Sequence, residues 1–266
     1  MPELPEVERE VRRLRPAMEG ARFERVDVRR RKLRTRLPAR FESRLQGATV
    51  AALRRRGKYL VADLSSGATL VMHLGMSGSF EVQRHETSPL AAHDHVIFHM
   101  SNGSTIVFND PRRFGSMWLF DRAASKGDPT AALGPEPLDD AFVAERLAER
   151  LHGRRAPLKS SLSDQRLVAG LGNIYVSEAL HRARLSPTRA SGTLVNPSGA
   201  PQASLRSLVR AVRDTLNDAL TEGWNYDRLR VYDREGERCL RRGCRGTIKR
   251  IVQAGRSTFF CPRCQR

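Results

Sequence analysis

The sequence between residues 23 and 120 divides into eight short segments that are rich in β-branched and aromatic residues. Turn residues separate these segments, as in the Ser-Ser-Gly at 65–67 and the Ser-Asn-Gly at 101–103. This pattern predicts antiparallel strands, and a β-sandwich or barrel is the natural way to pack so many of them. We expect the strands at residues 23–30, 49–56, 59–64, 69–74, 79–82, 95–100, 105–109 and 116–120.

The rest of the chain has mostly helical periodicity. Val7, Val11, Leu14 and Met18 recur at the spacing of one helical face near the N-terminus. Residues 125–137 are rich in Gly, Pro and Asp, which is typical of a linker. Beyond it we expect a helix that is capped by Asp139 or Asp140 and carries Phe142, Leu147 and Leu151. A second helix is expected at 156–168, followed by a tight turn at 169–175 and a third helix to residue 183. A long helix at 204–220 would then be stopped by Gly223.

These patterns predict an α+β fold in three parts. Residues 1–125 would form a β-sandwich domain with a long N-terminal helix, and residues 138–225 a helical domain. Residues 230–266 would form a small cysteine-bearing tail.

Positive charge dominates the composition. There are 47 Lys and Arg residues against 29 Asp and Glu residues, and the formal net charge is +18. This balance indicates a nucleic-acid partner or, less often, an anionic membrane surface. No apolar run is long enough to span a membrane and no signal-peptide segment follows Met1, so we expect a cytoplasmic protein.

The four cysteines lie close together near the C-terminus. Cys239 and Cys244 are separated by four residues, Cys261 and Cys264 by two, and sixteen residues lie between the pairs. In a cytoplasmic protein this spacing predicts two knuckles that hold one tetrahedral structural zinc ion, and not disulfides.

The hairpin expected between the two cysteine pairs carries Lys249, Arg250 and Arg256. Basic side chains on a small rigid finger are suited to contact DNA phosphates, although a solvated hairpin face would have the same composition.

The N-terminus offers a chemical group of its own. Removal of Met1 would leave the secondary amine of Pro2 as the α-amine, next to the carboxyl group of Glu3. A free α-amine titrates near pH 8, so an unprotonated fraction can attack a carbonyl carbon, and Glu3 could donate a proton beside it. The same residues also suit the start of a helix.

Two other segments are open to a binding or a purely structural interpretation. In the expected helical hairpin at 159–183, the N–H groups around Gly172 and Asn173 could receive a phosphate, or the glycines could serve only the turn. The loop at 109–115 carries two arginines and Phe114, which could enter a base stack or form an ordinary β-turn.

Taken together, several motifs resemble the bacterial formamidopyrimidine-DNA glycosylases, in the same order and over nearly the whole chain. They are Pro2-Glu3 with Leu4-Pro5-Glu6, Gly57-Lys58-Tyr59-Leu60, His73-Leu74-Gly75-Met76-Ser77-Gly78, His93-Asp94-His95, Asp110-Pro111-Arg112-Arg113-Phe114-Gly115, Gly170-Leu171-Gly172-Asn173-Ile174-Tyr175 and the segment from Gly255 to Cys264. The resemblance implies a helix–two-turn–helix DNA-binding domain at 138–225, a zinc-finger β-hairpin at 230–266 and a catalytic domain at 1–125.

The resemblance also implies a reaction on double-stranded DNA that carries oxidised bases or abasic sites. Pro2 would attack C1′ of a damaged purine nucleotide and form a Schiff base, with Glu3 as the proton donor. Lys58 would assist β-elimination, and Arg256 the δ-elimination that follows. Such an enzyme combines glycosylase and AP lyase activities and acts as a monomer.

Other positions match supporting residues of that family. Glu6 and Glu178 resemble its supporting acids near the N-terminal amine. Met76, Arg112 and Phe114 resemble the residues that fill the void left by an everted nucleotide, which cannot react inside the duplex. The remaining DNA-binding matches are His73, His93, Arg112, Arg154, Lys159 and Asn173.

The sequence departs from the family pattern at two places, of which the first bears on specificity and the second on local packing. The segment between Leu220 and Val231 is short where the family usually has a long loop that covers an everted 8-oxoguanine, and Ser163 stands where an apolar residue is usual. Oxidised-pyrimidine excision, as in the endonuclease VIII branch, therefore stays an alternative. A zinc-finger damage-binding protein without catalysis is another. A generic RNA-binding module is disfavoured, because the sequence has no aromatic platform for stacking bases.

Overall fold

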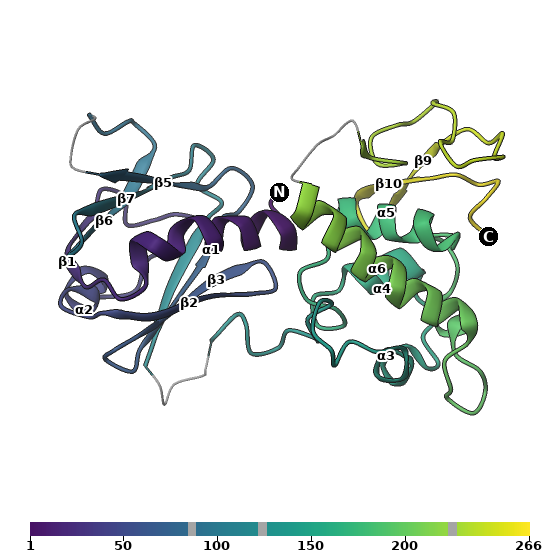
Figure 1. Cartoon of the computed structure of the whole chain (residues 1–266), viewed down its shortest axis with the longest axis horizontal. Helices are drawn as coiled ribbons and strands as arrows, with labels where there is room; N and C mark the ends of the chain where they lie inside the picture. Colours follow the sequence, from purple (N-terminus) through teal and green to yellow (C-terminus); the bar gives the residue numbers. More distant parts are fainter. Residues whose placement is uncertain (85–88, 122–126, 223–227) are drawn as a thin grey trace. The chain divides into compact units, whose positions relative to one another are not determined.

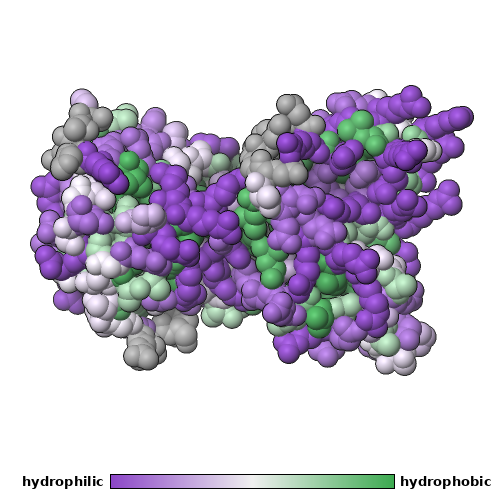
Figure 2. Space-filling model, viewed as in Figure 1, coloured by the Kyte–Doolittle hydropathy of each residue, from purple (hydrophilic) through white to green (hydrophobic). Residues whose placement is uncertain are grey.

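The computed structural model describes residues 1–84, 89–121, 127–222 and 228–266 (Figure 1). The chain divides into two compact units, Met1–Ala131 and Ala132–Arg266. Figure 2 shows hydrophilic side chains over much of the visible face of each unit, in keeping with the high net charge. None of the helices in the described ranges is long and apolar enough to cross a membrane.

The first unit is an antiparallel β-sandwich with one long helix, as predicted. One four-stranded sheet has the order β1-β6-β7-β5, and the other has the order β2-β3-β4-β8. The elements are α1 (Leu4–Met18), β1 (Phe23–Val28), α2 (Phe41–Leu45), β2 (Val50–Arg56), β3 (Tyr59–Leu64), β4 (Thr69–His73), β5 (Ser79–Arg84), β6 (Asp94–Met100), β7 (Ser104–Asn109) and β8 (Ser116–Phe120).

Residues from both sheets and from α1 form one hydrophobic core. Phe23 and Phe98 meet with ring centroids 5.4 Å apart, and Phe80 and Phe108 with centroids 5.0 Å apart. Each fully buried side chain of this size contributes about 1.5–3 kcal/mol through removal of apolar surface from water. This core fixes the strand ends, from which the functional turns project.

Helix α1 is held to the sandwich by an apolar face and by polar contacts at its edges. Its buried residues include Val7, Val11 and Leu14, which recur at the spacing of one helical face. The Glu10 carboxylate accepts the N–H of Phe80 in β5 at 3.0 Å, and Arg15 donates to the Leu53 carbonyl in β2 at 3.1 Å. These contacts fix the helix on the sandwich, and Pro2 and Glu3 directly precede its first residue.

The second unit is helical and ends in a two-stranded hairpin. Helix α5 packs against α4, α6 and strand β10. The finger has a small core of its own, which includes Val231, Ile248 and Phe259. The elements are α3 (Ala144–Leu151), α4 (Leu158–Ser163), α5 (Asn173–Ala183), the short 3-10 helix η1 (Ser191–Leu194), α6 (Ala203–Glu222), β9 (Lys249–Gln253) and β10 (Arg256–Phe260).

Two expected helix boundaries in this unit were wrong. Helix α3 begins at Ala144, because Val143 is extended, so neither Asp139 nor Asp140 caps it. Helix α4 ends at Ser163 and not near residue 168, and the segment after it is folded around the side chain of Gln165. The expected stop of α6 at Gly223 lies outside the described residues.

Candidate functional site

The N-terminal residues form the cap of α1. Glu3 is the N-cap residue and is 2% exposed. Its N–H donates to the Glu6 carboxylate at 2.8 Å, and its own carboxylate accepts the backbone N–H of Glu6, which completes a capping box. Pro2 precedes this cap and is half-buried. The capping box therefore fixes Glu3 and Glu6 relative to each other, and Pro2 directly precedes them in the chain.

Arg55 connects this helix to the turn that carries Lys58. The Arg55 guanidinium contacts the Glu8 carboxylate of α1 at 3.0 Å and donates to the Gly57 carbonyl at 3.2 Å. Its side chain is 9% exposed and that of Glu8 is 19% exposed, so the ion pair is poorly screened by solvent. Lys58, in the tight turn between β2 and β3, is 6% exposed. Arg55 thus ties the backbone next to Lys58 to the helix that begins just after Glu3.

His73 is the last residue of β4 and pairs with Tyr59 of the neighbouring strand β3. Burial, followed by the charges of Lys58 and Arg34, lowers the pKa of His73 to about 4. The ring is therefore neutral near pH 7. Its Nδ1 accepts the N–H of Gly75 at 3.0 Å, which places the remaining ring proton on Nε2. His73 can act as a neutral hydrogen-bond donor to a phosphate oxygen.

Met76, Arg112 and Phe114 are carried by two adjacent turns. Met76 is 42% exposed and Phe114 is 40% exposed, which is high for large apolar side chains. The Arg112 guanidinium lies 4.7 Å from the centroid of the Phe114 ring, as a cation–π pair. A Cβ on Gly75 would lie 2.3 Å from the Phe114 backbone, so only glycine permits this close approach. The structure thus brings the three predicted void-filling residues onto one pair of contacting turns.

His93 is exposed and lies just before β6, beside the same pair of turns. Its carbonyl accepts the N–H of Asp110 at 3.0 Å. The following residue, Asp94, accepts the Ala91 N–H at 2.6 Å and the Asn109 amide at 2.7 Å. The exposed imidazole is therefore presented by a well-braced loop.

Lys159 of α4 is buried and holds the finger hairpin. Its side chain is 3% exposed, and its Nζ donates to the Ser257 carbonyl at 2.9 Å and to the Thr258 hydroxyl at 2.7 Å. The sequence predicted a phosphate contact for Lys159. That role stays a prediction, and the contacts in the structure give Lys159 a part in placing the finger.

Arg256 begins β10 and is exposed at the end of the hairpin. It lines a cavity of about 250 Å³ between the end of α4 and the hairpin turn. The cavity walls are Lys159, Ser160, Ser163, Asp164, Gln253, Ala254 and Arg256. The departure from the family pattern at Ser163 thus lies in this cavity, where the Ser163 hydroxyl donates to the Lys159 carbonyl at 2.9 Å.

Asn173 is the first residue of α5, and its half-buried side chain follows the tight turn at 169–172. Gln165 organises this turn by donating to the Leu171 carbonyl at 2.6 Å and accepting the Gly170 N–H at 2.9 Å. The Asn173 Oδ1 is buried with no protein partner in the described part of the chain. Arg154, after α3, is exposed and donates to the Arg150 carbonyl.

Glu178 of α5 has contacts that the sequence did not predict. Its carboxylate accepts the backbone N–H groups of Arg230, Val231 and Tyr232, each at 2.9 Å. Burial raises its pKa, and these three donors oppose the shift. Glu178 therefore fixes the chain that leads into the finger. Its predicted role near the N-terminal amine stays a prediction.

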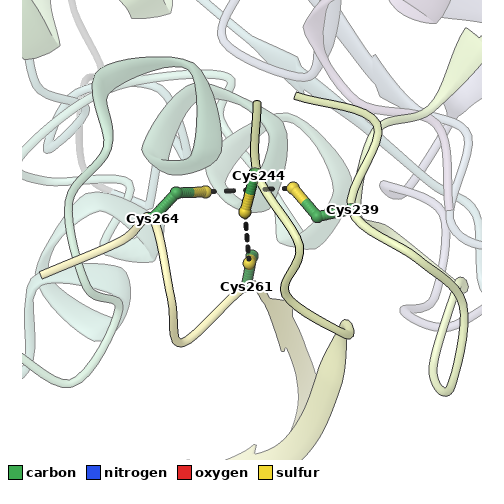
Figure 3. Close-up of side chains that lie close together, drawn as sticks. All are labelled: Cys239, Cys244, Cys261 and Cys264. Atoms are coloured by element: carbon green, nitrogen blue, oxygen red, sulfur yellow. Dashed lines mark hydrogen bonds between the residues drawn. The ribbon is translucent and has the colours of Figure 1, made fainter. Parts of the chain in front are cut away.

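The four cysteine sulfurs converge on one point (Figure 3). Cys239 and Cys264 have their sulfurs 3.9 Å apart, Cys244 and Cys261 have theirs 3.7 Å apart, and all four lie within 4.8 Å of one another. A tetrahedral zinc ion with Zn–S bonds of 2.3 Å separates its sulfurs by about 3.8 Å. The geometry therefore fits one structural zinc ion, in agreement with the prediction.

The surroundings of the cysteines also favour a bound cation. Burial and the neighbouring Cys261 raise the pKa of Cys264 to about 12, so a bound cation would stabilise the Cys264 thiolate. A Cβ on Gly246 would lie 2.6 Å from the Cys261 sulfur, so this knuckle needs glycine. His181 of α5, a residue absent from the sequence prediction, lies 3.4 Å from the Cys239 sulfur through its Nε2.

Three family models match the chain in succession. Residues 1–117 match the formamidopyrimidine-DNA glycosylase N-terminal domain, and residues 133–228 match the H2TH domain of the same enzymes. Residues 236–266 match the zinc finger found in FPG and IleRS. The chain belongs to the formamidopyrimidine-DNA glycosylase family.

Relatives over the full length of the chain carry the same name. The formamidopyrimidine-DNA glycosylase of Rhodopseudomonas palustris (strain BisA53) is 51% identical over 293 aligned positions, which cover 100% of each chain. The alignment is longer than the 266 residues of this chain, so this chain lacks residues that the relative has.

Solved structures of the formamidopyrimidine-DNA glycosylase family have the same fold. The Lactococcus lactis enzyme, non-covalently bound to DNA with an abasic site, matches with a TM-score of 0.88 and 30% identity over 99% of each chain. That enzyme is also known in complex with DNA containing an oxidised pyrimidine. The Thermus thermophilus enzyme matches with a TM-score of 0.81 and 38% identity, over 99% of this chain and 98% of that chain.

Sequence reasoning missed the residues that hold this formamidopyrimidine-DNA glycosylase site together. Arg55, Asp110, Gln165 and His181 act through partners that are distant in sequence or belong to the backbone. A polar residue beside a glycine-rich turn, such as Asp110 or Gln165, was the one signal that could have suggested such a role.

Proposed function

We propose that the chain is a base-excision repair DNA glycosylase with AP lyase activity that acts on oxidised purines in double-stranded DNA. The observation that carries the proposal is the N-terminal group of Pro2 and Glu3 at a capped helix start, within a chain about half identical to formamidopyrimidine-DNA glycosylases over its full length. Because its substrate is DNA, we propose that the enzyme acts in the cytoplasm at the nucleoid. We propose that it acts as a monomer.

The proposed reaction begins at C1′ of the damaged nucleotide. After loss of Met1, the Pro2 nitrogen attacks C1′ and the bond from C1′ to the base breaks. The departing base takes up the proton that the Pro2 nitrogen loses, and Glu3 donates a proton to O4′. The sugar ring opens at O4′, and an iminium ion links Pro2 to C1′. The capping box of Glu3 and Glu6 supports this step by fixing the carboxyl group beside the amine.

Strand cleavage follows from the iminium ion, which makes the neighbouring C–H bonds acidic. Loss of a proton from C2′ expels the 3′ phosphate, and we assign assistance to Lys58. Loss of a proton from C4′ then expels the 5′ phosphate, and we assign assistance to Arg256. The zinc ion has no part in these bonds and stabilises the finger that carries Arg256.

DNA contact would use both units. His73 and His93 in the first unit, and Arg154, Lys159 and Asn173 in the second, are proposed to bind the backbone or the damaged strand. Met76, Arg112 and Phe114 would occupy the space of the everted nucleotide, with Arg112 facing the orphaned base.

An oxidised-pyrimidine glycosylase is the second candidate. The segment before Val231 is short, and half of it, residues 223–227, lies outside the described residues. The Lactococcus lactis enzyme has been captured with oxidised-pyrimidine DNA, so the family fold accepts such a lesion. The proposed preference for purines rests on Leu4 and on the loop 111–114, which match the purine branch.

The experiment that decides between the candidates uses four duplexes, which carry a formamidopyrimidine, 8-oxoguanine, thymine glycol or an abasic site. Excision with borohydride trapping on the formamidopyrimidine duplex is the expected result. Trapping only on thymine glycol and abasic duplexes would move the substrate to pyrimidines. Binding without trapping on any duplex would leave a damage-binding protein.

A further inference from the structure

Asp110 is a buried carboxylate to which the proposed reaction gives no part. It follows β7 directly and is 0% exposed. Its Oδ1 accepts the Ser77 hydroxyl at 2.7 Å, and its Oδ2 accepts the Gly115 N–H at 2.7 Å. Removal of a buried carboxylate from water is costly, so its place here requires well-formed hydrogen bonds.

The two oxygens of Asp110 bind different turns. Ser77 belongs to the turn after β4, which presents Met76, whereas Gly115 closes the loop that presents Arg112 and Phe114. The Ser77 hydroxyl also accepts the N–H of Arg112 at 3.3 Å. The side chains of Asp110 and Ser77 therefore join the two turns, because they contact each other and each also accepts a backbone N–H of the loop at 110–115.

The backbone carbonyl of Asp110 makes further contacts that hold the same loop. The Asp110 carbonyl accepts the Arg113 N–H at 3.1 Å, and the buried His95 ring contacts the same carbonyl through Nε2 at 2.9 Å. A Cβ on Gly115 would lie 3.1 Å from Asp110 Oδ2, which leaves little room for the loop to shift. The carboxylate and its neighbours thus fix the loop at its start and at its end.

We infer that Asp110 and Ser77 are positioning residues that lock the two turns together, so that Met76, Arg112 and Phe114 enter DNA as one rigid wedge. This inference rests on the proposed function, in which those three side chains fill the void of the everted nucleotide. A wedge fixed before binding loses little conformational entropy when it enters the base stack. Loosening the link would slow entry into a duplex and leave the chemistry at C1′ intact.

The test compares Schiff-base trapping on an abasic site within a duplex and within the same oligonucleotide as a single strand, where no void must be filled. We expect Ser77→Ala and Asp110→Asn to slow trapping on the duplex about tenfold, which is the effect of one lost buried hydrogen bond. The rate on the single strand should stay at the wild-type value. Ser77→Thr, which keeps the hydroxyl, should restore the rate on the duplex.

Two controls separate the positioning role of Asp110 and Ser77 from the proposed void-filling role of the wedge. Ser66→Ala removes a hydroxyl from the turn at the other end of β4 and should change neither rate. Phe114→Ala should slow trapping on the duplex if the wedge fills the void. With 2-aminopurine as the orphaned base, the fluorescence change on binding should be slower in Ser77→Ala than in wild type.

Wild-type rates on the duplex in both Ser77→Ala and Asp110→Asn would overturn the positioning role, and a defect in Phe114→Ala would then leave the proposed function standing. An equal loss on duplex and single strand would also overturn it, because the defect would lie in the general fold. Failure of the wild-type protein to trap on any DNA would instead refute the proposed function on which the inference rests.

Discussion

The two segments proposed to touch DNA at the lesion are held in place by different means. In the first unit, the pair of turns around Met76 and Phe114 is joined by the carboxylate of Asp110. In the second unit, the finger that carries Arg256 is held by four cysteines and by the buried Lys159. The first arrangement forms whenever the sandwich folds, whereas the second also needs a metal ion. The two segments should therefore respond differently to metal, pH and mutation.

Loss of the metal should produce the largest difference between the two segments. Cys261→Ser or chelation should disorder β9 and β10, because binding of structural zinc supplies about 10–16 kcal/mol in small fingers. DNA affinity should fall about a hundredfold or more, while hydrogen exchange in β1–β8 stays at its native rate. Exchange mass spectrometry with and without added zinc tests this, and native protection of β9 in the Cys261→Ser variant would contradict it.

The pH response of the first unit should depend on His73. Its pKa is about 4 in the folded protein, against about 6.5 when unfolded, so the unfolded chain takes up a proton first as the pH falls. The free energy of unfolding should be unaffected by His73 above pH 6.5 and should drop by up to ~3 kcal/mol between pH 6.5 and 4.

Denaturant unfolding of wild type and His73→Gln across this pH range isolates the effect, because the carboxyl groups titrate alike in both proteins. The variant should lose less stability on acidification. Parallel curves for the two proteins would show that His73 is not held neutral by the fold.

Replacement of Lys159 should loosen the finger without removing zinc. Lys159→Met leaves the Ser257 carbonyl and the Thr258 hydroxyl without their donor, at a cost of about 1–3 kcal/mol. Because Arg256 lies on the same hairpin, we expect more β-elimination product relative to the δ-elimination product. Lys249→Met, on the exposed face of β9, is the matched control for the product ratio, because it removes a lysine charge from the same hairpin and leaves the Lys159 contacts to Ser257 and Thr258 in place. An unchanged product ratio in Lys159→Met would contradict the assignment of the δ-elimination to an Arg256 that Lys159 holds in place.

The smallest effect is expected at the hairpin turn. Ala254 has φ 47°, in the left-handed region that disfavours residues with a Cβ. Ala254→Gly should relieve this strain and stabilise the hairpin by up to about 1 kcal/mol. Thermal unfolding followed by a finger-specific probe tests it, with Ala200→Gly in the exposed loop before α6 as control. A less stable Ala254→Gly variant would show that flexibility outweighs strain here.

Sequence periodicity predicted most of the fold because the core follows it. Strands β3 and β8 have the expected bounds, and the other strands differ by one or two residues at their ends. The five-residue helix α2 was missed, since so short a segment has no helical period to detect. The early end of α4 follows from Gln165, whose side chain bonds to the turn at 170–171 in place of a helical backbone.

The candidate site was predictable where residues are recognised by type and spacing, as with the four cysteines. It was not predictable where a side chain acts through distant backbone. Lys159 binds the backbone and side chain of residues about a hundred positions away, and Glu178 binds three N–H groups more than fifty positions away. The backbone partners carry no sequence signal, because almost every residue supplies an N–H group and a carbonyl.

In the proposed reaction, the amine of Pro2 forms the covalent intermediate. The most direct measurement is borohydride trapping of the processed protein on an abasic duplex, followed by peptide mapping of the cross-link by mass spectrometry. The account predicts one adduct on the peptide that begins at Pro2, and its loss in Pro2→Gly with DNA affinity retained. An adduct on a lysine-containing internal peptide, or undiminished trapping by Pro2→Gly, would contradict it.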